Sequence, residues 1–344
     1  MSFNGFPFSF IVMSDNHMTA NDKDEKNINN KNLKNAIVEN QKTNPVNWIV
    51  SCGDLMDRAK DHEDEKFNDL WWPDFEAYKH RHGGTPLLLE GLGNHDTEFQ
   101  NGSKADYYKK FLLKHNEERE NQIRRREDGF PTEFFKDYTK DSGKLHYYWR
   151  YTVDEGKFHF FMLNKFPGKG HGEPLWNENV RRRTDPDNSL PFLIDTLKKI
   201  PHDEPVFLFH HYGFRFQNVD NTLDDHWTAK QREEYVKAIA DHKVVCIFYG
   251  HWHTLFYEKY NFTLCSIENG VGISRTVPLN TICAGLAASG IAVHCTVSKS
   301  GKSEFKYMMD IIQWNADANG KSTHDIREFV NGVHTQNPVG RIYF

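Results

Sequence analysis

Five short apolar runs, spread over most of the chain, each end abruptly in a cluster of polar side chains. Runs of this length that are rich in branched and aromatic residues are typical of buried strands. In a sheet flanked by helices, ligands collect beyond the carboxyl ends of the strands. The five clusters are therefore expected to converge on one crevice. They are Asp15-x-His17, Gly53-Asp54-x-x-Asp57-Arg58, Gly93-Asn94-His95-Asp96, His210-His211 and Gly250-His251-x-His253.

No single cluster carries this inference. Asp15 and His17 point the same way on an extended chain, because side chains alternate across a strand. In a chain with 19 His, however, such a pair also arises by chance and can be a hydrogen-bonded surface pair. The specific signal is the joint occurrence of all five clusters at predicted strand ends, three of them beside Gly.

Segments with helical periodicity alternate with the apolar runs, and β-like segments follow residue 255. An aromatic β-hairpin is expected over residues 144–164, turning at Asp154-Glu155-Gly156. This alternation predicts an α/β layered architecture. Helices are expected within residues 32–45, 62–82 with an interruption at Pro73, 103–126, 190–200 and 228–242.

Composition excludes several classes of protein. With a net charge of −5 and a pI near 6.4, the chain has no basic excess and no nucleic-acid-binding signature. No stretch approaches the roughly 18 apolar residues of a transmembrane helix, and the N-terminal residues lack the pattern of a signal peptide. The five Cys are scattered without a CxxC pair, so we expect most to be small core residues in a reducing, cytoplasmic compartment.

The length of 344 residues allows one large domain. We expect it over residues 1–312, with insertions at about 100–130 and 165–190, because polar loops of that length are usually functional or disordered. Residues 313–344 are expected to form a C-terminal extension without an assigned role.

Oxygen and nitrogen donors in the clusters suit Mn, Fe or Zn. The candidate metal ligands are too many for one catalytic ion with an open position, but they suffice for two ions if one carboxylate bridges them. Two metals about 3.5–4 Å apart can clamp the attacking and leaving oxygens of a phosphoryl displacement. The candidates are Asp15, His17, Asp54, Asn94, His210, His251 and His253.

In this order, the five clusters resemble the motifs of the calcineurin-like metallophosphoesterase superfamily, over residues 8–255. The resemblance implies a four-layer α/β/β/α sandwich, in which two mixed sheets are flanked by helices. It also implies two divalent ions, and hydrolysis of phosphate mono- or diesters by attack of a metal-bridging hydroxide.

The resemblance further implies a role for each cluster. His95 would be the general acid, and His211 would face away from the metals or line the pocket. One ion would take Asp15, His17, Asp54 and His253. The other would take Asp54, Asn94, His210 and His251, so that Asp54 bridges the two.

Asp57 and Arg58 stand where the Ser/Thr phosphatase branch has a carboxylate that orients the catalytic His and an Arg that contacts phosphate. We therefore name both as candidate catalytic residues. For Arg58, a salt bridge on the following helix is the alternative. Purple acid phosphatases place a metal-binding Tyr three residues after the bridging Asp; Asp57 has that place here, which argues against an iron–tyrosinate site.

The surroundings typical of protein phosphatases are absent, which favours a small-molecule or lipid-head-group phosphoester over a phosphoprotein. In the long polar loop, Arg181, Arg182 and Arg183 could recognise an anion or simply be solvated, and Trp176 could stack on substrate or pack. Two rival functions stay open: a catalytically inactive scaffold of the same fold that binds protein partners, and a single-metal hydrolase of a non-phosphate bond.

Overall fold

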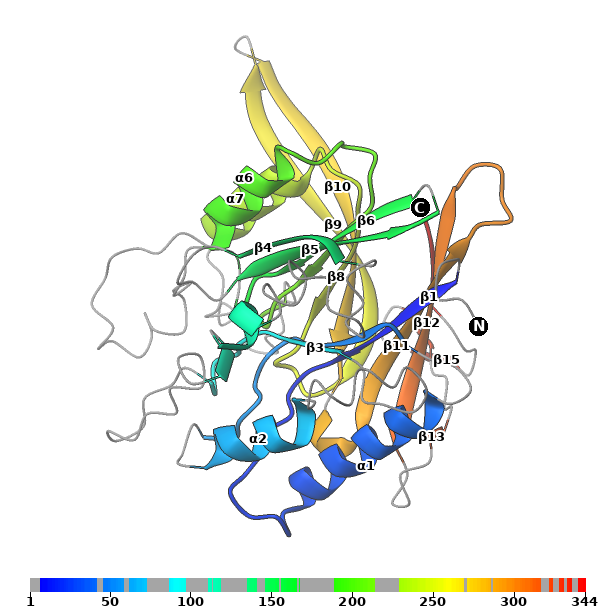
Figure 1. Ribbon diagram of the computed structural model, residues 1–344. Coiled ribbons are helices and arrows are strands. Elements are labelled where there is room, and N and C mark those ends of the chain that lie inside the picture. Colours follow the sequence, from blue (N-terminus) through cyan, green and yellow to red (C-terminus); the bar gives the residue numbers. More distant parts are fainter. Residues whose placement is uncertain are drawn as a thin grey trace, which may run out of the picture.

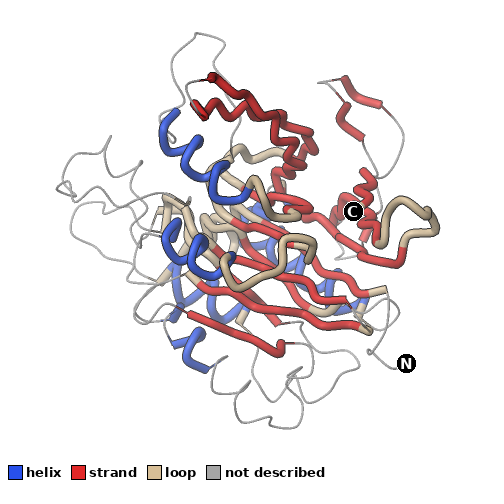
Figure 2. The backbone as a smooth tube through the Cα atoms, turned by 90° about the horizontal axis from the view of Figure 1, so that it is seen from above, coloured by secondary structure: helices blue, strands red, loops and turns tan. Residues whose placement is uncertain are grey.

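Two mixed β-sheets lie face to face in the computed structural model of the chain, and helices cover their outer faces (Figure 1). The result is the expected four-layer arrangement, and Figure 2 shows its strands and helices from a second direction. The structure describes residues 7–41, 46–58, 62–72, 87–96, 111–112, 114–118, 135–140, 146–154, 156–165, 167, 189–213, 229–268, 271–285, 287–316, 322–323, 328–330, 333–335 and 340–344.

The first sheet contains the strands that carry the first three polar clusters. Its order is β13 (Ser322–Thr323), β12 (Tyr307–Ala316), β11 (Ile291–Lys299), β1 (Phe8–Met13), β2 (Trp48–Ser51) and β3 (Leu87–Glu90), with β16 (Gly340–Tyr343) also paired with β12. Strands β1, β2 and β3 are parallel. Their carboxyl ends therefore lie at one edge of the sheet.

The second sheet contains the strands that carry the two histidine clusters. Its order is β4 (Phe135–Lys140), β5 (Tyr147–Val153), β6 (Gly156–Met162), β7 (Val206–Phe209), β8 (Val244–Tyr249), β10 (Val271–Ala284) and β9 (Leu255–Glu268). Strands β6, β7, β8 and β10 are parallel. Strands β5 and β6 pair antiparallel, which confirms the expected aromatic hairpin. A separate short pair joins β14 (Glu328–Val330) and β15 (Val333–Thr335).

Helices α1 (Glu25–Asn40) and α2 (Glu63–Trp71) cover the first sheet, and α6 (Ser189–Leu197) and α7 (Ala229–Ile239) cover the second (Figure 1). All four lie in or overlap an expected helical segment. Helix α2 ends at Trp71, shortly before Pro73, as expected from the clash of a proline ring with a preceding helical turn. Of the helix expected over 103–126, only residues 111–112 and 114–118 are described, and 114–118 are helical.

Helix α1 begins earlier than we expected, within the Asn- and Lys-rich stretch. Asp24 caps it by accepting a hydrogen bond from the Lys26 N–H, which satisfies one of the unpaired donors of the first turn. Leu33 and Ile37 pack into the core, but Asn27 and Asn30 are buried as well. Apolar periodicity alone therefore misses the first two turns of this helix.

Strand β1 shows why its sequence is a nearly continuous apolar run. Phe8, Phe10 and Val12 lie in the core between the sheets, whereas Ile11 and Met13 belong to the core under α1 and α2. A strand buried on both faces has no solvated positions for polar residues. As expected, most cysteines are also core residues: Cys52, Cys246, Cys283 and Cys295 are buried, and Cys265 is exposed.

The sheet continues past the boundary at residue 312 that we expected from the sequence. That boundary falls inside β12, and β16 pairs with β12 further along the chain. Ile342 and Phe344 lie in the core between the sheets. Part of the expected C-terminal extension therefore belongs to the sandwich. Within the described residues, no helix has the length and apolar character needed to cross a membrane.

Candidate metal centre

The ends of β1, β2, β7 and β8 bring two groups of potential ligands together. The first group is Asp15, His17, Asp54 and His253, and the second is Asp54, His211 and His251. In each group the ligand atoms all lie within 4.8 Å of one another. Asp54 belongs to both groups, as a bridging carboxylate would.

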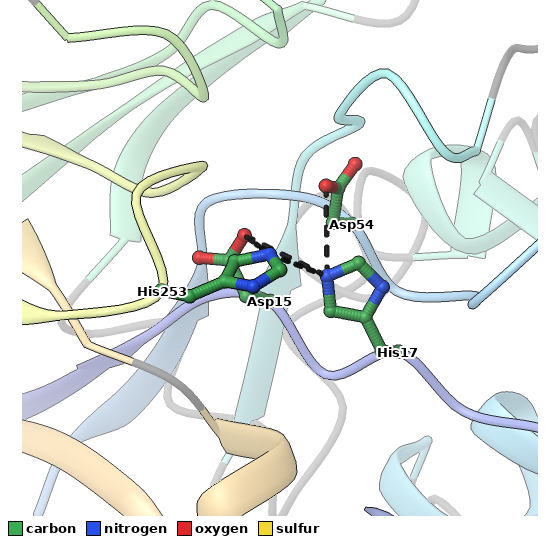
Figure 3. Close-up of side chains that lie close together, drawn as sticks. All are labelled: Asp15, His17, Asp54 and His253. Atoms are coloured by element: carbon green, nitrogen blue, oxygen red, sulfur yellow. Dashed lines mark hydrogen bonds and ion pairs between the residues drawn. The ribbon is translucent and has the colours of Figure 1, made fainter.

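In the first group, the side chains point toward one another (Figure 3). His17 Nε2 lies 2.9 Å from His253 Nε2, 3.8 Å from Asp54 Oδ2 and 3.9 Å from Asp15 Oδ1. Both Asp15 oxygens accept the His251 N–H at 3.0 Å, which ties the end of β1 to the loop after β8. Asp15, His17 and Asp54 are buried.

In the second group, His211 Nε2 lies 3.1 Å from Asp54 Oδ2 and 3.1 Å from Asn94 Oδ1. His251 Nδ1 also lies 3.1 Å from Asn94 Oδ1, so Asn94 joins this group through its amide oxygen. His211 Nδ1 lies 3.0 Å from the carbonyl oxygen of Cys52, which can only accept a hydrogen bond. The Nδ1 proton is therefore committed there, and Nε2 is the atom that faces Asp54.

His210, the expected ligand, lies elsewhere, and His211, which we expected to face away from the metals or to line the pocket, faces Asp54. Side chains alternate along β7: Phe207 and Phe209 face the core between the sheets, and Leu208 faces the helix side. Continuing the alternation sends His211 to the inter-sheet side and His210 to the helices, where its ring meets Tyr235 edge-on at 5.6 Å. Burial lowers the pKa of His210 to about 3.

This placement predicts that two matched variants differ in the number of metal ions that they bind. Asn keeps a donor near the position of His Nδ1 but lacks an equivalent of Nε2. We expect His211→Asn to bind one metal ion fewer than the wild type, and His210→Asn to bind the same number. Metal content after dialysis, measured by elemental analysis, tests this. Loss of an ion from His210→Asn, with His211→Asn fully loaded, would reverse the assignment.

Backbone strain is concentrated at the centre. Asp15, His17, Asp54, His251 and His253 have φ values of 56°, 46°, 53°, 72° and 50°. A residue with a side chain is rarely left-handed, and such residues cluster at functional sites where the surrounding structure maintains them. The chain thus turns sharply at the ends of β1, β2 and β8.

Two glycines allow the strand ends to approach so closely. A Cβ at Gly93 would lie 2.2 Å from Asp54 Oδ1, and a Cβ at Gly250 would lie 1.8 Å from Ser14 Oγ. Neither position has room for a side chain. These are two of the three glycines that the sequence places beside a polar cluster.

Asp96 connects two of the ligand loops, a role that we did not predict. Its Oδ1 accepts the N–H groups of Leu55 and Met56 at 2.8 and 3.0 Å, and its Oδ2 accepts the Gly93 N–H at 2.7 Å. Burial, together with the negative charge of Asp54, raises the pKa of Asp96 to about 7. Its place one turn after Gly93 is the sequence signal that could have indicated this bond.

His95 lies beside the first group. Its backbone N–H donates to Asp54 Oδ1 at 2.8 Å. Its ring meets the His17 ring edge-on, with 4.7 Å between the ring centroids. Its Nδ1 hydrogen-bonds to the backbone carbonyl of Asp57. The Asp57 carboxylate pairs instead with Lys26 and lies 3.6 Å from His17 Nδ1. The expectation that this carboxylate orients His95 is therefore corrected, because the carbonyl of the same residue makes that contact.

Arg58 is at the rim of the centre. Its side chain is 61% exposed, and its Nε lies 3.4 Å from Asp57 Oδ2. Its role toward phosphate stays a prediction. Arg181 to Arg183, Trp176, and most of both expected insertions lie outside the described residues.

The centre attracts positive charge. Burial lowers the pKa of His17 to about 4, although Asp54 and Asp15 oppose this shift, so His17 is neutral at pH 7. Burial acts in the same direction on His211, but Asp54, Asp15 and Asp96 outweigh it and raise the pKa of His211 to about 9. Burial alone would raise the pKa of Asp54, yet His211 and the other histidines lower it.

The residues present fit divalent cations. Asp54 Oδ2 is buried and accepts no well-aligned hydrogen bond, although His211 Nε2 is close to it. Carboxylate, amide and imidazole donors without a thiolate are the set that suits Mn, Fe or Zn. The shared carboxylate allows two ions to lie side by side.

The sequence profile of the calcineurin-like phosphoesterase family matches residues 8–255. A comparison with curated proteins found no match. Among solved structures, GAP50, "the anchor in the inner membrane complex of Plasmodium", is 11% identical with a TM-score of 0.47, over 89% of this chain and 84% of that chain.

Two further solved structures are similar to the chain. The purple acid phosphatase PPD1 from yellow lupin (Lupinus luteus) seeds is 12% identical with a TM-score of 0.46, over 93% of this chain and 53% of that chain. A putative 5′-nucleotidase from Staphylococcus aureus is 13% identical with a TM-score of 0.42, over 86% of this chain and 51% of that chain. The matched region is about half of each of these two longer chains.

Proposed function

Because this chain belongs to the calcineurin-like phosphoesterase family, we propose that it hydrolyses phosphate mono- or diesters with two divalent metal ions. The observation that carries the proposal is the pair of ligand groups that share the Asp54 carboxylate. Side chains from both sheets build this pair, and strained backbone like that of these residues clusters at functional sites.

The geometry supports one set of ligands for each ion. Asp15, His17, Asp54 and His253 would hold one ion, and Asp54, Asn94, His211 and His251 would hold the other. Mn, Fe or Zn suits this donor set. When bound, the two ions supply Lewis acidity that activates water and stabilises negative charge at phosphorus.

We assign His95 as the general acid. Because its Nδ1 is bonded to the Asp57 carbonyl, which can only accept, a proton stays on Nδ1. Its Nε2 is then the atom that would deliver a proton to the leaving oxygen, from a ring that carries a proton on both nitrogens and becomes neutral after the transfer. The hydrogen bond from the backbone N–H of His95 to Asp54 Oδ1 holds His95 beside the shared carboxylate.

For the substrate, we propose a small-molecule or lipid-head-group phosphoester. Arg58 would contact its phosphate, since this side chain is largely exposed at the rim, where its ion-pair partner among the described residues is Asp57 at 3.4 Å. An Arg guanidinium can bind two phosphate oxygens at once.

Hydrolysis of mono- and bis-nitrophenyl phosphate tests this function. We expect turnover with Mn²⁺ or Zn²⁺, loss of turnover after chelation with EDTA, and recovery when the metal is added back. Metal content of two ions per chain should accompany activity. A fully loaded protein that hydrolyses neither these esters nor a panel of natural phosphoesters would indicate the scaffold instead, and one ion per active chain would contradict the dinuclear centre.

A further inference from the structure

Helix α1 holds the ligand segment at the end of β1 through buried asparagines. Asn30 Nδ2 donates to the Asn16 carbonyl at 2.8 Å, and Asn16 Nδ2 donates back to Asn30 Oδ1 at 2.7 Å. One turn earlier, Asn27 Oδ1 accepts the Thr19 N–H at 2.9 Å and its Nδ2 donates to the Thr19 carbonyl at 2.7 Å. The first turns of α1 are therefore docked on both sides of His17.

The neighbouring residue on α1, Lys26, extends to the second ligand loop. Its Nζ forms a hydrogen-bonded ion pair with Asp57 Oδ1. The Lys26 side chain is 39% exposed and that of Asp57 is 16% exposed, so the contact is partly shielded from water. Burial would raise the pKa of Asp57, but the hydrogen bond from Lys26 helps to hold it below its usual value and keeps the carboxylate charged.

The same Asp57 oxygen lies beside an unsatisfied ring nitrogen. His17 is 3% exposed, and its Nδ1 is buried without a hydrogen-bond partner in the described part of the chain. Asp57 Oδ1 lies 3.6 Å from it. A histidine that binds a metal through Nε2 keeps its proton on Nδ1, and a carboxylate that accepts a hydrogen bond from this N–H fixes the ring and makes Nε2 more basic.

We propose that Lys26 is a positioning residue for the metal centre: it holds the Asp57 carboxylate beside His17 Nδ1, so that His17 Nε2 faces the first ion. This inference rests on the proposed function only in taking His17 as a metal ligand. It also gives Asp57 a different partner from the one that the sequence suggested, a ligand histidine in place of the general acid. Arg58, the other cation at Asp57, is farther away and more exposed.

The test compares Lys26→Met, which keeps the length of the side chain but removes its charge, with Lys26→Arg, which restores a cation. Lys31→Met is the matched control, because Lys31 is an exposed lysine on the same helix. Calorimetric titration of the metal-free protein with Mn²⁺ gives the affinity for each of the two ions. Thermal unfolding in EDTA shows whether a variant is folded.

We expect Lys26→Met to lower the affinity for one of the two ions by about 10- to 100-fold, which is the range for loss of a partner that orients a metal ligand. Lys26→Arg should recover most of this affinity, and Lys31→Met should match the wild type. Asp57→Asn should lower the affinity for the same ion. Adding Lys26→Met to Asp57→Asn should lower this affinity little further, because both changes act through one contact.

Wild-type affinity for both ions in Lys26→Met would overturn the proposal. An equal loss for both ions, together with a lower unfolding temperature, would also overturn it by showing a merely structural role. The readout is binding, so the proposed function is tested separately: a wild-type chain that binds two ions but hydrolyses no phosphoester contradicts the function and leaves the role of Lys26 to be decided by the affinities.

Discussion

Asp54→Asn is expected to remove the binding of both metal ions together and to lower phosphoester turnover by roughly 10³-fold or more. Asp54 is the only residue common to the two ligand groups found in the described part of the chain. Asn has nearly the same shape but lacks the charge, so both ions lose their shared anionic ligand. Metal catalysis contributes several kcal/mol to transition-state stabilisation, and about 4 kcal/mol corresponds to three decades of rate.

Measurement of metal content and turnover at saturating Mn²⁺ checks this prediction. Asp195→Asn removes one exposed carboxylate from α6 and is the control for the change in charge; its metal content and rate should not change. Unfolding of the Asp54→Asn protein in EDTA, compared with wild type in EDTA, shows whether the fold persists. If the variant kept one ion with wild-type affinity, Asp54 would not be shared by the two sites.

His95→Asn is expected to keep both ions and to lose turnover by roughly 10²-fold or more, the usual contribution of a general acid. The loss should depend on the leaving group. A nitrophenolate leaves easily without a proton, whereas an alkoxide needs one, so alkyl phosphates should lose more than nitrophenyl phosphate. This dependence follows from the assignment of the proton to His95 Nε2, and a structural role for His95 would not produce it.

Rates of wild type and His95→Asn with a series of aryl and alkyl phosphates test this directly. The plot of rate against leaving-group pKa should be steeper for the variant. An equal loss of rate for every ester, or a wild-type rate on alkyl phosphates, would show that His95 is not the general acid. Metal analysis of the same preparations separates this effect from loss of an ion.

Some of the architecture could be predicted from the sequence, because one pattern, an apolar run followed by a polar cluster, repeats along the chain. Strands β1, β2, β3, β7 and β8 are short apolar runs, and one polar cluster follows each of them, so the rule for strand ends applies to all five. The aromatic hairpin around Asp154 was readable for the same reason, since a turn with Gly156 separates two alternating runs. Helix α1 was only half visible, because its first turns are anchored by hydrogen bonds from Asn27 and Asn30 and not by apolar contacts.

Adjacent residues of one type were the hardest to separate. His210 and His211 have the same chemistry, and only their faces differ: one packs against Tyr235 and the other against Asp54. Alternation along β7 says that they face opposite ways, but it does not say which face meets the other sheet. Asp57 is a similar case, because its backbone carbonyl and its carboxylate contact different histidines.

By itself, the sequence determined the layered α/β class and the resemblance that implied the sandwich, and it placed acids, amides and imidazoles at the carboxyl ends of strands. These properties depend on local periodicity and on motif order, which a chain carries in one dimension. Only the tertiary structure decided that His211 and not His210 joins Asp54, that Asp96 ties two loops, and that Lys26 reaches Asp57. Those are contacts between segments far apart in the chain, and they depend on which face of each element packs against the next.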